Sequence, residues 1–288
     1  MDFIYCLLLL PKVSNFSSTV YLKMLNRQQY IAIATSILLV FGMYFGCNRV
    51  PKDHKSKEQT VASLPAEDAE IGEWITKAKT KLSPEVSENV TSIEQQIKMA
   101  SSDTAKSNLM KQLSSTWYRQ KQMIVAGYYA NQIAAIDKTE KGWNIAASTL
   151  LEGIRESEDT HLKQYCSENA AKAYENAIVL APKEVDYQIG LALCYTELPP
   201  QDNPMKGILQ LRELDTKFPN NAKVLFQLAK LAMRTNQYEK AVARLEQILK
   251  TNPNNPDAIC LIADAYKGQG NAAKASVFAQ KCQNLFKK

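Results

Sequence analysis

Histidine is scarce in this chain, which has only His54 and His161 among its 288 residues. The six cysteines are scattered, without a CxxC pair and without a companion histidine at a metal-ligand spacing. These absences exclude the common zinc and haem sites. A Gly-rich phosphate loop, a GxSxG turn and an HExxH motif are also missing. We therefore expect no catalytic residue, no metal, no cofactor and no small-molecule substrate.

One histidine and one cysteine lie close enough in sequence to be tested as a catalytic pair. His161 and Cys166 are five residues apart, so on a helix their side chains point about 140° away from each other. That angle makes a poor nucleophile–base pair. Cys194, Cys260 and Cys282 fall in apolar helical patterns, where a cysteine is usually a small buried hydrophobe. No feature of the sequence requires a disulfide.

A strong charge of one sign is also missing from most of the chain. The formal net charge is +6, and residues 1–59 hold seven lysines and arginines against three acidic residues. Residues 60–288 are therefore close to neutral. A protein that binds nucleic acid normally carries a basic surface, so no nucleic-acid partner is expected.

The longest apolar run extends over Tyr30–Cys47, eighteen residues without a charge. A helix of this length reaches about 27 Å, the lower end of what a bilayer requires. Tyr30 and Tyr44 stand near its two ends, as interfacial aromatic residues do. The sequence predicts a single transmembrane helix at 30–47, after an N-terminal extension at 1–29.

Three other interpretations of this run remain open. A cleaved signal peptide is one, although no small-x-small cleavage site follows. A lipoprotein signal with Cys47 as the modified residue is another, and Met24 as the true start is the third. The basic residues on the two sides of the run are nearly balanced, so the side of the membrane that holds the C-terminal part is undetermined.

Residues 48–70 are polar and without apolar periodicity, which predicts a flexible tether. Helical periodicity starts near Ile71, and residues 71–106 form a helical lead-in. One helix is expected over Glu73–Lys81. Ser83 then caps a second helix, with Pro84 at its first position and its end near Ala100. Ser102 and Asp103 cap the next one.

The last quarter of the chain repeats itself with an offset of 34 residues. Placing 222–255 over 256–288 pairs Leu225 with Ile259, Leu228 with Ile262, Ala229 with Ala263, Asn236 with Gly270 and Ala241 with Ala275. Apolar residues three and four apart give each helix one buried stripe, and a small residue such as Gly207 lets two helices approach closely. Asn236 and Gly270 are expected to end the first helices in the left-handed conformation. Pro219 and Pro253 stop the second helices.

A helix–turn–helix unit of 34 residues resembles the tetratricopeptide repeat (TPR). The resemblance is strong at 222–288 and weaker over the rest of 107–288. It implies an all-α fold, a TPR-type α-solenoid of stacked antiparallel helix pairs. The units span about 107–139, 140–184, 185–221, 222–255 and 256–288. The second unit has about eleven extra residues, expected to lengthen its helices, and the third has a three-residue insertion around PPQDNP.

In the resembled family, a groove lined by the first helices binds protein segments. The family's groove positions fall on Asp186, Ile189, Leu193, Thr196 and Glu197 in the third unit. In the fourth and fifth units our candidates are Lys223, Phe226, Lys230, Met233, Arg234, Asp257, Asp264 and Lys267, with Cys260 and Gly268 at the remaining positions. Phe226, Lys230 and Arg234 form a stripe that could receive an acidic peptide.

With the apolar run, the tether and the repeats together, the chain resembles a bacterial membrane-anchored repeat protein that crosses the inner membrane once. The expected function is a scaffold that binds protein or peptide partners, for example in the assembly or quality control of envelope proteins. Two alternatives stay open: an accessory subunit of a membrane-associated enzyme complex, and a self-assembling structural scaffold.

Overall fold

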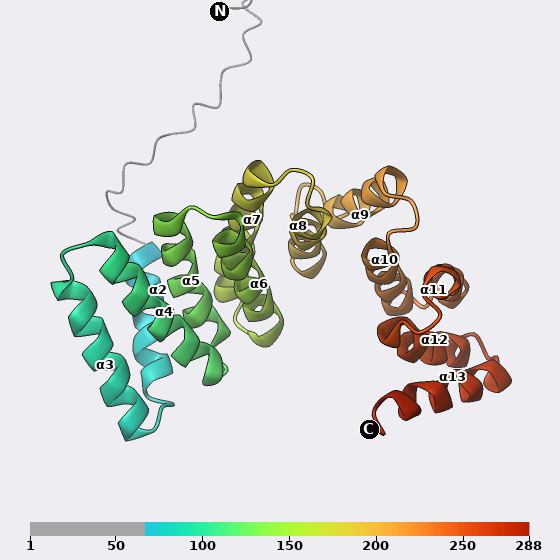
Figure 1. Cartoon of the computed structure of the whole chain (residues 1–288), viewed down its shortest axis with the longest axis horizontal. Helices are drawn as coiled ribbons and strands as arrows, with labels where there is room; N and C mark the ends of the chain where they lie inside the picture. Colours follow the sequence, from blue (N-terminus) through green and yellow to red (C-terminus); the bar gives the residue numbers. More distant parts are fainter. Residues whose placement is uncertain (1–66, 288) are drawn as a thin grey trace, which may run out of the picture. The chain divides into compact units, whose positions relative to one another are not determined.

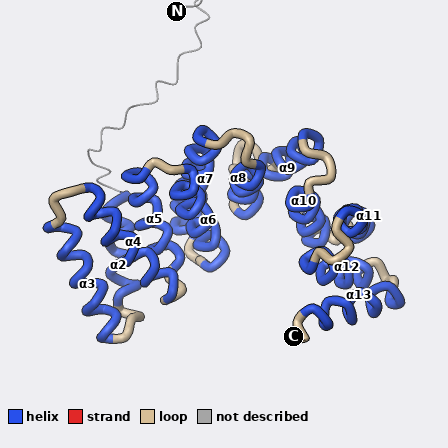
Figure 2. Tube along the Cα trace, in the orientation of Figure 1, coloured by secondary structure: helices blue, strands red, loops and turns tan. Residues whose placement is uncertain are grey.

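The computed structural model describes residues 67–287, which fold into α-helices joined by short loops (Figure 1). No strand occurs within these residues (Figure 2). The helices are α2 (Glu67–Lys79), α3 (Pro84–Met99), α4 (Asp103–Arg119), α5 (Met123–Asp137), α6 (Glu140–Glu156), α7 (Thr160–Leu180), α8 (Val185–Glu197), α9 (Lys206–Lys217), α10 (Ala222–Arg234), α11 (Tyr238–Thr251), α12 (Pro256–Gly268) and α13 (Ala272–Leu285). The all-α prediction is confirmed for this part of the chain.

The predicted membrane segment cannot be compared with the structure. Residues 30–47, the extension before them and the tether as far as residue 66 lie outside the described residues. Within 67–287, every helix is too short or too polar to cross a bilayer.

The helix starts follow the capping residues in the sequence. The Ser83 hydroxyl accepts a hydrogen bond from the Val86 amide, and Pro84 occupies the first turn of α3. Ser102 caps α4 in the same way. Both predicted caps are confirmed, because each hydroxyl satisfies a backbone N–H that has no partner inside the helix. The helix before Ser83 begins and ends earlier than predicted, because α2 runs from Glu67 to Lys79 and the prediction was Glu73–Lys81.

The helix ends also follow their predicted signals in the last two units. Asn236 and Gly270 have φ angles of 56° and 83°, so both adopt the predicted left-handed conformation. The second helices stop before Pro219 and Pro253. Lys121 and Lys138 are left-handed as well, and the sequence did not indicate this, because lysine rarely adopts positive φ.

The irregular second and third units keep the helical pattern. The extra residues of the second unit lengthen α6 to 17 residues and α7 to 21, as predicted. In the third unit, α8 ends at Glu197 and α9 begins at Lys206. The loop between them carries Pro199, Pro200 and Pro204, which remove backbone donors and stop a helix from forming.

Successive helices pack as antiparallel pairs, α4 with α5, α6 with α7, α8 with α9, α10 with α11 and α12 with α13. Their apolar stripes form four buried clusters instead of one core. The cluster around Trp117 joins α2–α5, and the cluster around Leu150 joins α5–α8. Leu211 lies in the cluster shared by α8–α10, and Leu245 in the cluster shared by α10–α13. This packing places the first helices α8, α10 and α12 one after another in the same order as in the sequence.

One expectation about the cysteines was wrong. Cys194 is a buried hydrophobe as predicted, but Cys260 and Cys282 are half-buried and form a disulfide between α12 and α13. Their Cα atoms are 4.9 Å apart, inside the range that a disulfide needs. The sequence separation of 22 residues resembles no disulfide motif, and only the crossing of the two helices brings the cysteines together.

Candidate partner-binding groove

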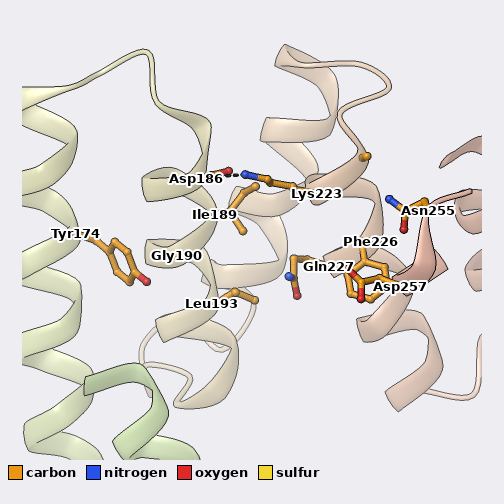
Figure 3. Close-up of a pocket in the computed structure, with 11 residues that line it drawn as sticks. Tyr174, Asp186, Ile189, Gly190, Leu193, Lys223, Phe226, Gln227, Asn255 and Asp257 are labelled. Atoms are coloured by element: carbon orange, nitrogen blue, oxygen red, sulfur yellow. Dashed lines mark hydrogen bonds and ion pairs between the residues drawn. The ribbon is translucent and has the colours of Figure 1, made fainter. Parts of the chain in front are cut away.

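The first helices of the third, fourth and fifth units enclose a cavity of about 360 Å³ (Figure 3). Residues from α8, α10 and α12 line it, together with Tyr174 of α7. They are Tyr174, Asp186, Ile189, Gly190, Leu193, Ala222, Lys223, Phe226, Gln227, Asn255 and Asp257. The cavity therefore lies on the face that the resemblance implies for binding.

The groove combines apolar walls with polar groups. Ile189, Leu193 and Phe226 give apolar contact area, and Phe226 also packs partly against the cluster around Leu245. The half-buried Gln227 side chain makes no hydrogen bond to any residue between 67 and 287. Its amide can therefore pair with the backbone of a bound segment.

Tyr174 reaches the groove from α7 because α8 carries a glycine opposite its ring. A Cβ atom on Gly190 would lie 2.2 Å from Tyr174 Cζ, closer than real Cβ contacts. The tyrosine is 4% exposed, and burial raises the pKa of its phenol well above the ordinary value. The hydroxyl thus stays protonated at neutral pH and can donate a hydrogen bond at the wall of the groove.

Ion pairs connect the first helices to one another. Lys223 of α10 pairs with Asp186 of α8 at the mouth of the cavity (Figure 3). Glu197 of α8 binds Arg155 Nε of α6 at 3.2 Å and Arg234 Nη1 of α10 at 3.5 Å. Pairs this exposed contribute less than about 1 kcal/mol each. Their main effect is to orient charges across three neighbouring repeats.

The other predicted groove residues lie along the same helices, outside the cavity lining. Lys230 is exposed on α10, and Asp264 and Lys267 are exposed on α12. None of these three forms an ion pair within the described part of the chain. Met233 differs, because it is half-buried against the cluster around Leu245 and presents less surface than expected.

Some lining residues were not predicted. Tyr174 belongs to a second helix, and Gly190, Ala222, Gln227 and Asn255 fall between the family's groove positions. Asn255 had a recognisable signal, because Asn before Pro at a helix start is a capping pattern, and its side chain accepts a hydrogen bond from the Ala258 amide at 2.9 Å. Tyr174 had none, since its approach depends on Gly190.

The arrangement suits binding more than chemistry. His161 is exposed, whereas Cys166 is fully buried and its thiol pKa is raised to about 12 by burial. The two residues therefore do not form a reactive pair. Among residues 67–287, no group of three or more His, Cys, Asp or Glu side chains is placed to hold a metal ion.

Comparison with known proteins points to one repeat family. Residues 208–258 and 237–281 match the model described as tetratricopeptide repeat. The TPR repeat-containing protein YpiA of Bacillus subtilis (strain 168) is 35% identical over 65 residues, which are 23% of this chain and 15% of that protein. The chain thus matches a small part of this relative's length.

Solved structures give weaker matches over longer spans. A tetratricopeptide repeat protein from Parabacteroides merdae ATCC 43184 is 15% identical, with 75% of this chain and 80% of that chain covered and a TM-score of 0.48. A thermophilic TPR protein of Thermus thermophilus is 18% identical, with 62% of this chain and 89% of that chain covered and a TM-score of 0.46.

Proposed function

We propose that this chain, whose residues 208–281 match the tetratricopeptide-repeat family, is a membrane-anchored scaffold. Its partner is a protein segment that binds in the groove between α8, α10 and α12. The observation that carries the proposal is the cavity itself, where Phe226 lies beside Gln227, whose side chain makes no hydrogen bond within residues 67–287. This is the composition of a peptide site, which needs apolar anchors and a few polar groups that fix orientation.

The stripe of Phe226, Lys230 and Arg234 along α10 favours an acidic segment that carries one large apolar residue. Phe226 offers the apolar contact, and Lys230, one turn further along α10, is an unpaired cation within the described residues. Arg234 lies one turn later and forms an ion pair with Glu197. A carboxylate on the ligand would meet Lys230 first and compete with Glu197 for Arg234.

The double variant Phe226→Ala, Lys230→Glu is expected to lose at least tenfold in partner capture. It removes the apolar anchor and reverses an unpaired cation one turn further along α10, and loss of one anchor commonly weakens binding by about ten- to hundredfold. The measurement is quantitative affinity capture with the full-length chain in detergent, followed by mass spectrometry.

The matched control is Lys250→Glu with Phe286→Ala, because both residues are exposed and lie outside the groove. It makes the same chemical changes elsewhere on the repeats. If the control loses the same partners as the groove variant, or the groove variant loses none, binding does not occur at Phe226.

The anchor in this proposal is the apolar segment at residues 30–47. We further propose that the repeats lie on the oxidising side of the membrane. The Cys260–Cys282 disulfide supports this orientation, because disulfides persist in oxidising compartments and are rare in the cytosol.

Topology reporters fused after Lys288 test the orientation. We expect activity from a reporter that works only after export and no signal from one that fluoresces only in the cytoplasm. The opposite result would place the repeats in the cytoplasm and remove envelope proteins as partners. A chain with residues 30–47 deleted serves as the control, since it should not be exported.

A further inference from the structure

Tyr174 is the least exposed of the polar residues that line the groove between α8, α10 and α12, with 4% of its surface accessible. Its hydroxyl forms no hydrogen bond with any residue between 67 and 287. Within the same residues, the fully enclosed side-chain N and O atoms without a partner belong to Trp117 and Gln210. The Tyr174 hydroxyl is not one of them, so it is still open to solvent at the wall of the groove.

Gly190 leaves the opening through which the hydroxyl meets the groove. A Cβ atom at this position would lie 2.2 Å from Tyr174 Cζ and 2.7 Å from the hydroxyl oxygen, so any other residue would cover the phenol or displace it. Figure 3 shows the phenol directed at Gly190, with Ile189 and Leu193 on either side of the glycine along α8. A bound main chain that rests on these two apolar residues is held above the opening. Only a side chain then descends to the hydroxyl.

The opening is unfavourable for a charged group. Burial is the main reason that the pKa of the Tyr174 phenol lies well above its ordinary value, and the carboxylates of Glu152 and Asp186 raise the pKa further, while the Arg155 guanidinium lowers it. The phenol is therefore neutral at physiological pH and offers a hydrogen-bond donor. A carboxylate that entered the opening would lose water and would meet the negative charge of Asp186. An uncharged acceptor avoids both effects.

A side-chain amide is the uncharged group that matches this place best. Its carbonyl oxygen accepts a hydrogen bond from the Tyr174 hydroxyl, and its NH2 group needs an acceptor of its own. Asp186, which is close enough to act on the phenol, can provide one. Its ion pair with Lys223 uses Oδ2 and leaves Oδ1 without a partner within the described residues. An aliphatic side chain in the opening would instead displace water from the phenol and leave it unpaired, which is unfavourable.

The position of the amide is separate from the acidic positions of the segment. The cavity lining contains the carboxylates of Asp186 and Asp257 against the ammonium of Lys223, so the cavity itself does not attract negative charge. Lys230, the cation proposed to meet an acidic residue, lies outside the lining, one turn beyond Phe226 on α10. A segment that uses the whole groove therefore carries its amide over α8 and its carboxylates along α10.

Given that the groove binds a protein segment, as proposed above, we infer that the segment places an asparagine or glutamine side chain in the opening at Gly190. The carbonyl oxygen of this side chain accepts a hydrogen bond from the Tyr174 hydroxyl. Tyr174 is then a specificity-determining residue that a second helix contributes, whereas the resemblance implies groove residues on first helices. The segment must carry an amide residue in addition to a large apolar residue and acidic residues.

The test starts from phage-displayed random peptides that are selected for binding to the full-length chain in a zwitterionic detergent. Peptides that fail to bind the groove variant Phe226→Ala, Lys230→Glu are kept, labelled with fluorescein and measured by fluorescence anisotropy. We expect them to share an asparagine or glutamine at one position. Tyr174→Phe should weaken their binding about fivefold, the effect of one neutral hydrogen bond. Replacing the shared residue with leucine or with the corresponding acid should weaken binding at least as much, and Tyr174→Phe should then have no further effect.

The matched control is Tyr187→Phe, the same change at another buried tyrosine, which does not line the groove. It should bind every selected peptide like the unmodified chain. An equal loss in this control, or no loss with Tyr174→Phe, would overturn the role of Tyr174. So would a loss that persists after every asparagine and glutamine of the peptide has been replaced, because the main chain would then be the acceptor. If no selected peptide depends on Phe226 and Lys230, the groove is not the binding site, which contradicts the proposed function as well.

Discussion

Reduction of the Cys260–Cys282 disulfide is expected to lower the stability of the α12–α13 pair by about 3 kcal/mol, the value for a closed loop of about 22 residues. The effect should be concentrated in α13, because none of its residues is fully buried. Ala275 and Phe278 are only partly buried against the preceding helices. Hydrogen exchange with and without reductant measures this, and the α13 amides should lose most of their protection after reduction.

The double variant Cys260→Ser, Cys282→Ser is the control for the reductant. It should show fast exchange in α13 under both conditions, and adding reductant should change nothing. Cys166 and Cys194 should not respond, because both are fully buried and burial raises the pKa of each thiol to about 12. Unchanged protection of α13 in the reduced protein would mean that apolar packing alone holds the helix.

Replacing Gly207 with alanine is expected to destabilise the α8–α9 pair by about 2–3 kcal/mol. A Cβ atom at this position would lie 2.5 Å from the Ala192 carbonyl oxygen and 2.7 Å from the Thr196 amide nitrogen. Both are backbone atoms of α8, so no side-chain rotation relieves the contact and the helices must separate. This outweighs the gain of up to about 1 kcal/mol that alanine normally brings to a helix. Thermal unfolding measured by circular dichroism detects the loss.

Gly72→Ala is the matched control, because it makes the same substitution where a Cβ atom would meet nothing within 4 Å. Gly72 lies inside α2, so alanine should leave stability unchanged or raise it slightly. If the two variants melt alike, the close approach of α9 to α8 at Gly207 does not occur.

The fold was largely predictable because its signals are local. Helix starts were indicated by Ser83 and Ser102, and helix ends by Asn236 and Gly270. The offset of 34 residues predicted how the last helices pair. Each signal depends on a few neighbouring residues and on elementary backbone chemistry. Helix starts that lack a capping signal, such as the start of α2 at Glu67, were predicted less accurately.

The groove was predictable only where it follows the repeat pattern. Lys223, Phe226 and Asp257 were candidates and line the cavity. Tyr174 was missed because its place depends on a glycine in the next unit, and the disulfide because the crossing of α12 and α13 brings its cysteines together. These features arise from how helices meet in space, and a pattern of residue types along the chain does not contain them.

The division of the interior into four clusters has a consequence for how the gene can change. Each cluster touches only its neighbours in chain order, so a destabilising substitution in one cluster affects three or four helices and not the whole chain. A unit can then lengthen, as α6 and α7 have, or gain a proline loop, as the third has, without redesign elsewhere. Such a lineage can acquire new surfaces one unit at a time while older ones keep working.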